Sequence, residues 1–324
     1  MIFGKCAGKG VLLPTNTPSP FTGRERLCLL FLFIGAILLR LPEVLLTGRL
    51  FGEEGTFFFA YAWHGTDWQA FFHPLGGYFN IAASGTTLLA ARLVQSGWLP
   101  LGYAPYLTIG ASLAVQTMPA ILILGGRAPW LNSKLAVLFA LFVLAATPTT
   151  EEVWLQTLHI QFHLAVCLLI MIVTDPPEGW TARIGRALLA LLAPLCGPAS
   201  IALLPPMVVR SWLDAGRRRY WETGALAFGA AVQLLLFYTP SGVRGQSASP
   251  ILVGAAVFVR HIVNALLGEK LARNLGGALL ANNMVWLGAL GALAVMAALV
   301  VLAIRTRSVD ALLLLGMGLL VALI

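Results

Sequence analysis

Two adjacent carboxylates, Glu53 and Glu54, follow directly after the first long apolar run of the sequence. The chain has 324 residues and only 13 of them are acidic, so a neighbouring pair of acids at this place is unusual. A carboxylate at bilayer depth costs about 2.5–3.5 kcal/mol, and such acids therefore tend to lie at an interface or a cavity. Two adjacent acids can supply a general base with a hydrogen-bonding partner, or a coupled pair in which one pKa is raised. A solvated loop pair without a chemical role is the alternative.

A second polar cluster occupies residues 152–163. Its polar side chains are those of Glu152, Gln156, His159 and His163. In a continuous helix these four residues would fall on one face, at steps of four, three and four. A polar stripe inside a membrane bundle favours a role in lining a substrate cavity. Buried helix packing and a metal or haem site at the two histidines are the alternatives. The metalloprotease pattern is absent, so we predict no metal site and no cofactor, with a divalent metal left open.

Three isolated polar residues extend the set of candidates. His73 precedes the turn Pro74–Tyr78, and His64 lies in the same aromatic segment. Each imidazole can hold a phosphate oxygen or be a surface bystander. Arg92 lies inside the second apolar run. It can pair with an anionic lipid headgroup or extend its guanidinium group to the membrane interface.

The composition indicates that a membrane protein positions these residues. Hydrophobic residues make up 59% of the chain and charged residues 10%, with a mean hydropathy of +0.86. Soluble domains are about 25% charged. The net charge is +8, but the basic residues are scattered in short loops, which favours a role in membrane topology and argues against nucleic-acid binding. We predict an all-α polytopic bundle of about eight to ten transmembrane helices.

The order of apolar runs predicts the organisation of this bundle. Residues 1–26 are expected to form a disordered cytoplasmic tail, and 27–324 the transmembrane domain. A first span at 27–47 places the acidic pair on the extracytoplasmic face. The following loop, 48–78, mixes aromatic and polar residues and is expected to lie along the interface as one or two amphipathic helices. The further spans are expected at 79–97, 103–125, 135–147, 158–174, 222–238, 251–267 and 285–304.

Two regions do not fit a simple alternation of spans. The apolar stretch 187–209 has arginines on both sides, and the break at Cys196-Gly197-Pro198 would allow a re-entrant hairpin. The run Arg217–Arg219 is expected to be a solvated cytoplasmic anchor. Around 98–134 the count of spans conflicts with the preference of basic residues for the cytoplasmic side, and the topology stays open there. The sequence stops inside an apolar run, so it ends in a helix or belongs to a longer chain.

Four short motifs, in this order, resemble an uncharacterised bacterial branch of the GT-C superfamily of polytopic glycosyltransferases, found among surface-polysaccharide proteins. The motifs are Phe51-Gly52-Glu53-Glu54-Gly55-Thr56, Pro74-Leu75-Gly76-Gly77-Tyr78-Phe79-Asn80, the stretch from Glu152 to Gln161 with His163-Leu164-Ala165, and Gly197-Pro198 before Leu203-Leu204-Pro205. The similarity is scattered over about residues 27–210. The chain departs from the branch in having Glu53-Glu54 for Glu-Asp and Asn80 for His. It also lacks a following arginine, for which Arg92 is the nearest candidate.

This resemblance implies a lipid-linked sugar donor, usually a polyprenyl phosphate sugar, a glycan or lipid acceptor and inversion at the anomeric carbon. It implies a multi-pass protein of the bacterial inner membrane with its active face outside, and a catalytic base at Glu53 or Glu54. The expected substrate-binding residues are His73, Tyr78, Asn80, Arg92, Glu152, Gln156, His159, Gln161 and His163. A transporter or flippase of lipid-linked sugars and a non-catalytic membrane subunit are the alternatives; no internal repeat is visible, which disfavours the transporter.

Overall fold

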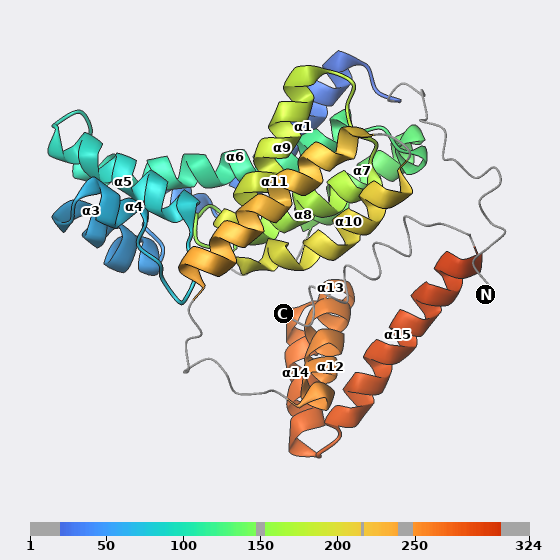
Figure 1. The fold of residues 1–324 in the computed structure, drawn as a ribbon. Helices are drawn as coiled ribbons and strands as arrows, with labels where there is room; N and C mark the ends of the chain where they lie inside the picture. The colour runs from blue at the N-terminus through green and yellow to red at the C-terminus, as the bar shows by residue number, and fades with distance from the viewer. Residues whose placement is uncertain (1–19, 147–152, 215–216, 239–248, 306–324) are drawn as a thin grey trace. The chain divides into compact units, whose positions relative to one another are not determined.

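The structure is a computed structural model that describes residues 20–146, 153–214, 217–238 and 249–305. Every regular element in these residues is a helix, as Figure 1 shows, so the all-α prediction is confirmed. The chain divides into two compact units, one made of residues 1–145 and 152–238 and the other of 146–151 and 239–324.

The first unit contains seventeen of the helical segments. In chain order they are α1 (Gly23–Leu38), α2 (Pro42–Thr47), η1 (Glu54–Phe59), α3 (Ala60–His64), α4 (Asp67–Phe71), α5 (Ile81–Gln95), η2 (Leu101–Tyr103), α6 (Ala104–Gly125), η3 (Pro129–Asn132), α7 (Lys134–Ala146), α8 (Ile160–Val173), α9 (Trp180–Leu195), η4 (Pro198–Leu203), α10 (Leu204–Leu213), η5 (Arg217–Arg219), α11 (Tyr220–Val232) and η6 (Gln233–Phe237). Among the η segments, η1 and η6 are π-helical and the others are 3-10 helices.

The structure changes the predicted first span and the predicted tail. Helix α1 begins at Gly23, inside the expected tail, where Thr22 caps it by accepting a hydrogen bond from the Glu25 N–H at 3.3 Å. The span predicted over 27–47 is broken after Leu38 because Pro42 starts a separate helix and the preceding Leu41 is not helical, with φ −133° and ψ 65°.

Helices α1 and α6 run antiparallel and share a hydrophobic core. Phe33 and Ile37 of α1 are buried in the same cluster as Ile109 and Ile123 of α6. At the far end of the pair, the Tyr106 hydroxyl donates a hydrogen bond to the Leu45 carbonyl at 2.9 Å. This core fixes the start of the loop that carries the acidic pair.

Within the described residues, two helices are long and apolar enough to cross a membrane, by length and composition: Leu101–Gly125 and Val285–Arg305. Three further apolar helices, Lys134–Ala146, Ile160–Val173 and Pro250–Arg260, are shorter. A spanning helix needs about 20 residues, so the larger number of spans stays a prediction.

The break predicted near 196–198 is present, between α9 and η4. Gly197 has φ 149° there, a conformation that L side chains rarely adopt, and a Cβ at this position would lie 2.0 Å from the Gln161 side-chain oxygen. The stretch after the break winds into η4 and α10. Helices α9 and α11 lie side by side, as Figure 1 shows.

The run of three arginines is not a uniformly solvated anchor, which corrects the prediction. Arg218 is exposed, but Arg219 is completely buried. Its guanidinium group donates to the Met171 carbonyl at 2.6 Å and the Thr174 carbonyl at 2.9 Å, and it forms an ion pair with Asp214 at 2.5 Å. Arg219 therefore caps the C-terminal end of α8, where carbonyls lack helical partners and the helix dipole favours a cation.

A second buried arginine completes this end of α8. Arg186 donates to the Met171 carbonyl at 2.8 Å and forms an ion pair with the buried Glu222 at 2.7 Å. The two arginines join α8, α9 and α11 around one helix terminus.

The second unit is described over residues 249–305. It contains α12 (Pro250–Val257), the π-helical η7 (Phe258–Val263), α13 (Asn264–Leu267), α14 (Glu269–Ala281) and α15 (Val285–Arg305). Helices α12 and α15 pack closely because small residues face each other: a Cβ at Gly288 would lie 3.0 Å from the Ala255 Cα. The amphipathic helix α14 was not predicted, since charged residues in its first two turns interrupt the apolar pattern.

Candidate functional site

The two adjacent acids have different surroundings. Glu54 is completely buried, whereas Glu53 is exposed. One Glu54 oxygen accepts hydrogen bonds from both the N–H and the hydroxyl of Thr157, each at 2.5 Å, and the other accepts from the Phe51 N–H at 3.0 Å. Glu54 thus joins the start of η1 to the turn before α8, and it is not available to an acceptor substrate.

Burial changes the ionisation of Glu54. Its removal from solvent raises the pKa of the carboxyl group. The three hydrogen bonds from Thr157 and Phe51, together with the positive charge of Arg49, offset part of this rise. Donors that point at both oxygens hold the side chain in one position. The acid pair is therefore one fixed structural carboxylate beside one exposed carboxylate.

The predicted helical stripe over 152–163 is wrong for the described residues. Leu155 has φ 55°, which interrupts a right-handed helix, and α8 begins only at Ile160. In the turn, the Gln156 side-chain oxygen accepts from the Leu158 N–H at 2.7 Å, and its amide nitrogen lies 2.6 Å from His159 Nδ1. Side chain to main chain bonds of this kind compete with helix formation.

Asn80 binds the same turn from another direction. Its amide donates to the Leu158 carbonyl at 3.0 Å, and its oxygen accepts from the Ala83 N–H at 3.1 Å, which caps α5. Asn80 is buried, so this expected substrate contact is a structural tie instead. Glu54 of the acidic pair and Thr157 of the second polar cluster are therefore in direct contact, but both side chains are buried.

The remaining residues of the second cluster lie in the core. Gln161 and His163 are both buried in α8, and the His163 ring contacts the Trp154 ring edge at a centroid distance of 4.9 Å. Gln161 packs against the Gly197 backbone. Glu152 lies outside the described residues. No group of three or more metal-ligating side chains is found in the residues that the structure describes.

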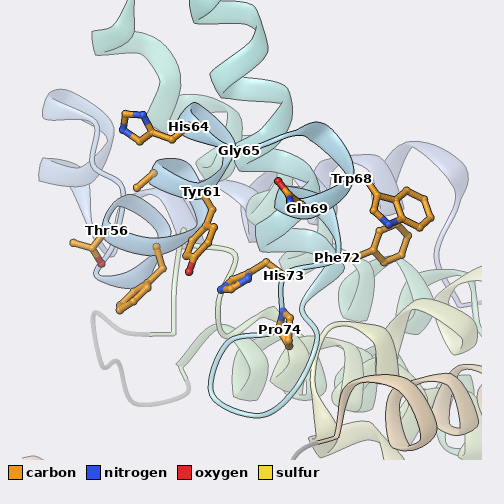
Figure 2. Close-up of a pocket in the computed structure, with 11 residues that line it drawn as sticks. Thr56, Tyr61, His64, Gly65, Trp68, Gln69, Phe72, His73 and Pro74 are labelled. Atoms are coloured by element: carbon orange, nitrogen blue, oxygen red, sulfur yellow. The ribbon is translucent and has the colours of Figure 1, made fainter.

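An open hollow of about 850 Å³ lies on the interfacial segment, and Figure 2 shows it. All of its lining comes from η1, α3, α4 and the residues just after them. The lining residues are Thr56, Phe57, Ala60, Tyr61, His64, Gly65, Trp68, Gln69, Phe72, His73 and Pro74. The prediction that 48–78 is helical is confirmed, with η1, α3 and α4 in place of one or two helices, whereas its position along a membrane interface stays a prediction. Both candidate histidines of this segment line the hollow.

Aromatic rings dominate the hollow. Tyr61 and His73 stack at a centroid distance of 3.8 Å in its centre, with Trp68 and Phe72, 4.2 Å apart, on one side and His64 on the other (Figure 2). Burial lowers the pKa of His73, which favours its neutral form. Thr56 and Gln69 add uncharged polar groups. The hollow therefore offers flat apolar surfaces with a few hydrogen-bonding groups, and the described residues that line it include no carboxylate, lysine or arginine.

Arg92 lies next to the hollow but is engaged by protein groups. It forms an ion pair with Asp67 at 2.6 Å, donates to the Gly65 carbonyl at 3.0 Å and also bonds Gln95. The guanidinium group thus fixes the connection between α3 and α4. This geometry differs from the expected role as a phosphate ligand.

The turn at 74–78 closes the segment. Leu75 and Tyr78 exchange main-chain hydrogen bonds around Gly76 and Gly77, whose φ values of 65° and 88° suit a tight hairpin turn. Tyr78 is half-buried and does not line the hollow. The turn brings the chain from the hollow to the start of α5.

The sequence analysis missed several residues of this region. Thr157 carries no local signal, because it meets Glu54 across 103 positions. Tyr61, Trp68 and Phe72 belonged to the aromatic segment that was recognised as a whole, and their helical spacing was the signal that could have placed them together.

Comparison of the chain with protein-family models, with curated proteins and with solved structures gives no match.

Proposed function

We propose that the chain is a multi-pass glycosyltransferase of the bacterial inner membrane, which transfers a sugar from a polyprenyl-phosphate donor to an extracytoplasmic acceptor. The observation that carries the proposal is the pair of unlike acids: Glu54 anchors the loop, and the exposed Glu53 stands three residues before Thr56, the first residue of the hollow. An exposed carboxylate that precedes the lining of an aromatic hollow by three residues, on a loop anchored by its neighbour, fits a general base at a substrate site.

In this mechanism Glu53 is the base and Glu54 a positioning residue. The acceptor hydroxyl oxygen attacks the anomeric carbon as its proton passes to Glu53. The bond from this carbon to the donor phosphate oxygen breaks, and its electron pair leaves with the polyprenyl phosphate. The configuration at the anomeric carbon inverts because attack and departure occur on opposite faces.

The hollow supports a role in holding the sugar. Binding sites of this kind combine apolar and aromatic walls with a few polar groups. The faces of Tyr61 and Trp68 suit the C–H side of a sugar ring, and Thr56, Gln69 and His73 can exchange hydrogen bonds with its hydroxyl groups.

A transfer assay tests the proposal. The full chain in lipid nanodiscs would be given a panel of polyprenyl-phosphate hexoses with a radiolabelled sugar, and label leaving the lipid phase would be measured. General base catalysis contributes about 10²–10⁴ in rate, so Glu53→Gln should lower transfer by that factor. Glu43→Gln, which changes another exposed acid in α2, is the matched control. Normal transfer by Glu53→Gln would defeat the assignment.

A non-catalytic subunit that binds lipid-linked sugars is the second candidate. It is favoured by the lining of the hollow, in which the structure describes no carboxylate. This candidate predicts that the wild-type chain binds the labelled donor, that Trp68→Ala weakens this binding, and that no label leaves the lipid phase with any acceptor tried.

A further inference from the structure

A second hollow, of about 260 Å³, lies in the first unit where α1 begins and α6 ends. It is a groove between the two antiparallel helices. Its lining residues are Gly23, Arg26, Leu27, Leu30, Ile121, Leu124 and Gly125. The groove is apolar except for one arginine, and its volume is below the 300–1,000 Å³ that is usual for a drug-sized ligand. It fits a narrow apolar chain better than a compact molecule.

Exposed apolar residues continue the groove along α1. Leu27 and Phe31, one helical turn apart, are 54% and 64% exposed. Ile121 on the facing helix is also exposed. A single extended acyl chain could therefore lie in the groove and along this stripe.

Basic residues surround the groove where α1 begins. Arg26 bonds the Phe21 carbonyl through Nε at 3.1 Å, and its two terminal nitrogens have no partner among the described residues. The exposed Arg24 likewise has none there. The neighbouring Lys134 is paired with Glu25 at 2.9 Å. Among the described residues, therefore, the guanidinium group of Arg26, which lines the groove, and that of Arg24, two residues earlier in the chain, have donors available for an anion.

We propose that this groove binds one anionic phospholipid, with an acyl chain between α1 and α6 and its phosphate at Arg24 and Arg26. Helix α6 is long and apolar enough to cross a membrane, so its last residues fall at the level of the headgroups. Basic pockets between such helices select anionic lipids, and each nearby arginine contributes about 1 kcal/mol, which is about a 5-fold preference. This site is independent of the proposed sugar transfer.

The exposed Cys28 follows Leu27 of the groove in the sequence and provides a reporter on α1, because Cys167 and Cys196 are buried. A fluorophore on Cys28, in a chain with Cys6→Ser, would be reconstituted in vesicles containing brominated phosphatidylglycerol or brominated phosphatidylcholine. We expect the anionic lipid to quench the fluorophore at a lower mole fraction. Equal quenching by both lipids would overturn the proposal. The same result is expected if residues 1–19 of the chain occupy the groove in place of a lipid.

Two variants separate charge from shape. Arg24→Gln with Arg26→Gln should lower the preference for phosphatidylglycerol about 25-fold, at about 5-fold for each arginine. Gly125→Leu keeps both charges and fills the groove, since a Cβ at Gly125 meets no atom within 4 Å. It should abolish the preference. Arg218→Gln, which removes another exposed charge, should leave it unchanged.

Each opposite result contradicts the site. A preference retained by Gly125→Leu would show that surface charge alone attracts the lipid. If Arg218→Gln lowered the preference for phosphatidylglycerol as much as the double arginine variant does, this too would show that surface charge alone attracts the lipid. Thermal unfolding of every labelled variant checks that the comparison is between folded chains.

Discussion

Thr157 donates both its main-chain N–H and its hydroxyl to one oxygen of Glu54, so a single buried carboxylate joins two segments that lie 103 positions apart. This contact links η1 to the turn before α8. It also gives the two neighbouring acids separate roles, because Glu53 remains exposed.

Changes at the buried acid should affect stability far more than changes at the exposed one. Glu54→Ala leaves two buried donors of Thr157 and the partly buried Phe51 N–H without an acceptor, at about 1–3 kcal/mol for each buried donor, and we expect a loss of about 3 kcal/mol or more. Thr157→Val removes one of these donors and should cost about 1–2 kcal/mol. Thermal unfolding in detergent would measure both, with Glu53→Gln as the control. A Glu53→Gln loss equal to that of Glu54→Ala would contradict the structural role.

Glu54 should also make the stability of the fold depend on pH. Burial raises its pKa in the folded chain above the value of about 4.3 for an unfolded glutamate. Between these two pKa values the folded chain binds more protons than the unfolded chain. The contribution of Glu54 to the free energy of unfolding is therefore fully present below about pH 4.3 and is lost as pH rises through the pKa of the folded chain.

The measurement is the unfolding midpoint from pH 4 to 8 for the wild-type chain and for Glu54→Gln. The wild-type midpoint should fall with rising pH relative to that of the variant, in which residue 54 cannot ionise. Parallel curves for the two proteins would show that Glu54 does not titrate differently on folding.

The sequence predicted the helical class and most helices, because long apolar runs and proline breaks are local signals. It placed the break at Gly197 correctly for this reason. It failed in the turn before α8, where the left-handed Leu155 and the bonds of the Gln156 side chain override a helical spacing. It also could not separate Glu53 from Glu54, since burial of Glu54 depends on Thr157, a residue without any local pattern.

The arginine run 217–219 gives a matched comparison between neighbouring residues. Arg219→Gln removes one of two cations that pair with Asp214, the other being Arg210 at 3.2 Å, and it leaves the buried carbonyl groups of Met171 and Thr174 without their donor. Each buried acceptor left without a donor costs about 1–3 kcal/mol. Arg218→Gln should change the unfolding midpoint little, because this side chain is exposed. Equal midpoints for the two variants would contradict the burial of Arg219.

Two roles of Arg92 can be distinguished by experiment, stabilisation of the connection between α3 and α4 and binding of a donor phosphate. Its bonds to Asp67 and Gly65 hold the connection between α3 and α4, so Arg92→Gln should increase hydrogen exchange of the amides at 65–69. The ion pair is partly exposed, and such pairs contribute about 0–1 kcal/mol, so the global unfolding midpoint should change little.

Asp67→Asn is the matched control for this test, because it removes the partner and keeps the arginine. If Arg92 acts through Asp67, both variants increase exchange at 65–69 and weaken binding of labelled polyprenyl-phosphate hexose together, since both loosen the wall of the hollow. If Arg92 binds the donor phosphate directly, Asp67→Asn frees its guanidinium group and strengthens donor binding, while Arg92→Gln weakens it. Opposite effects of the two variants on donor affinity would therefore contradict the structural tie as the main role of Arg92.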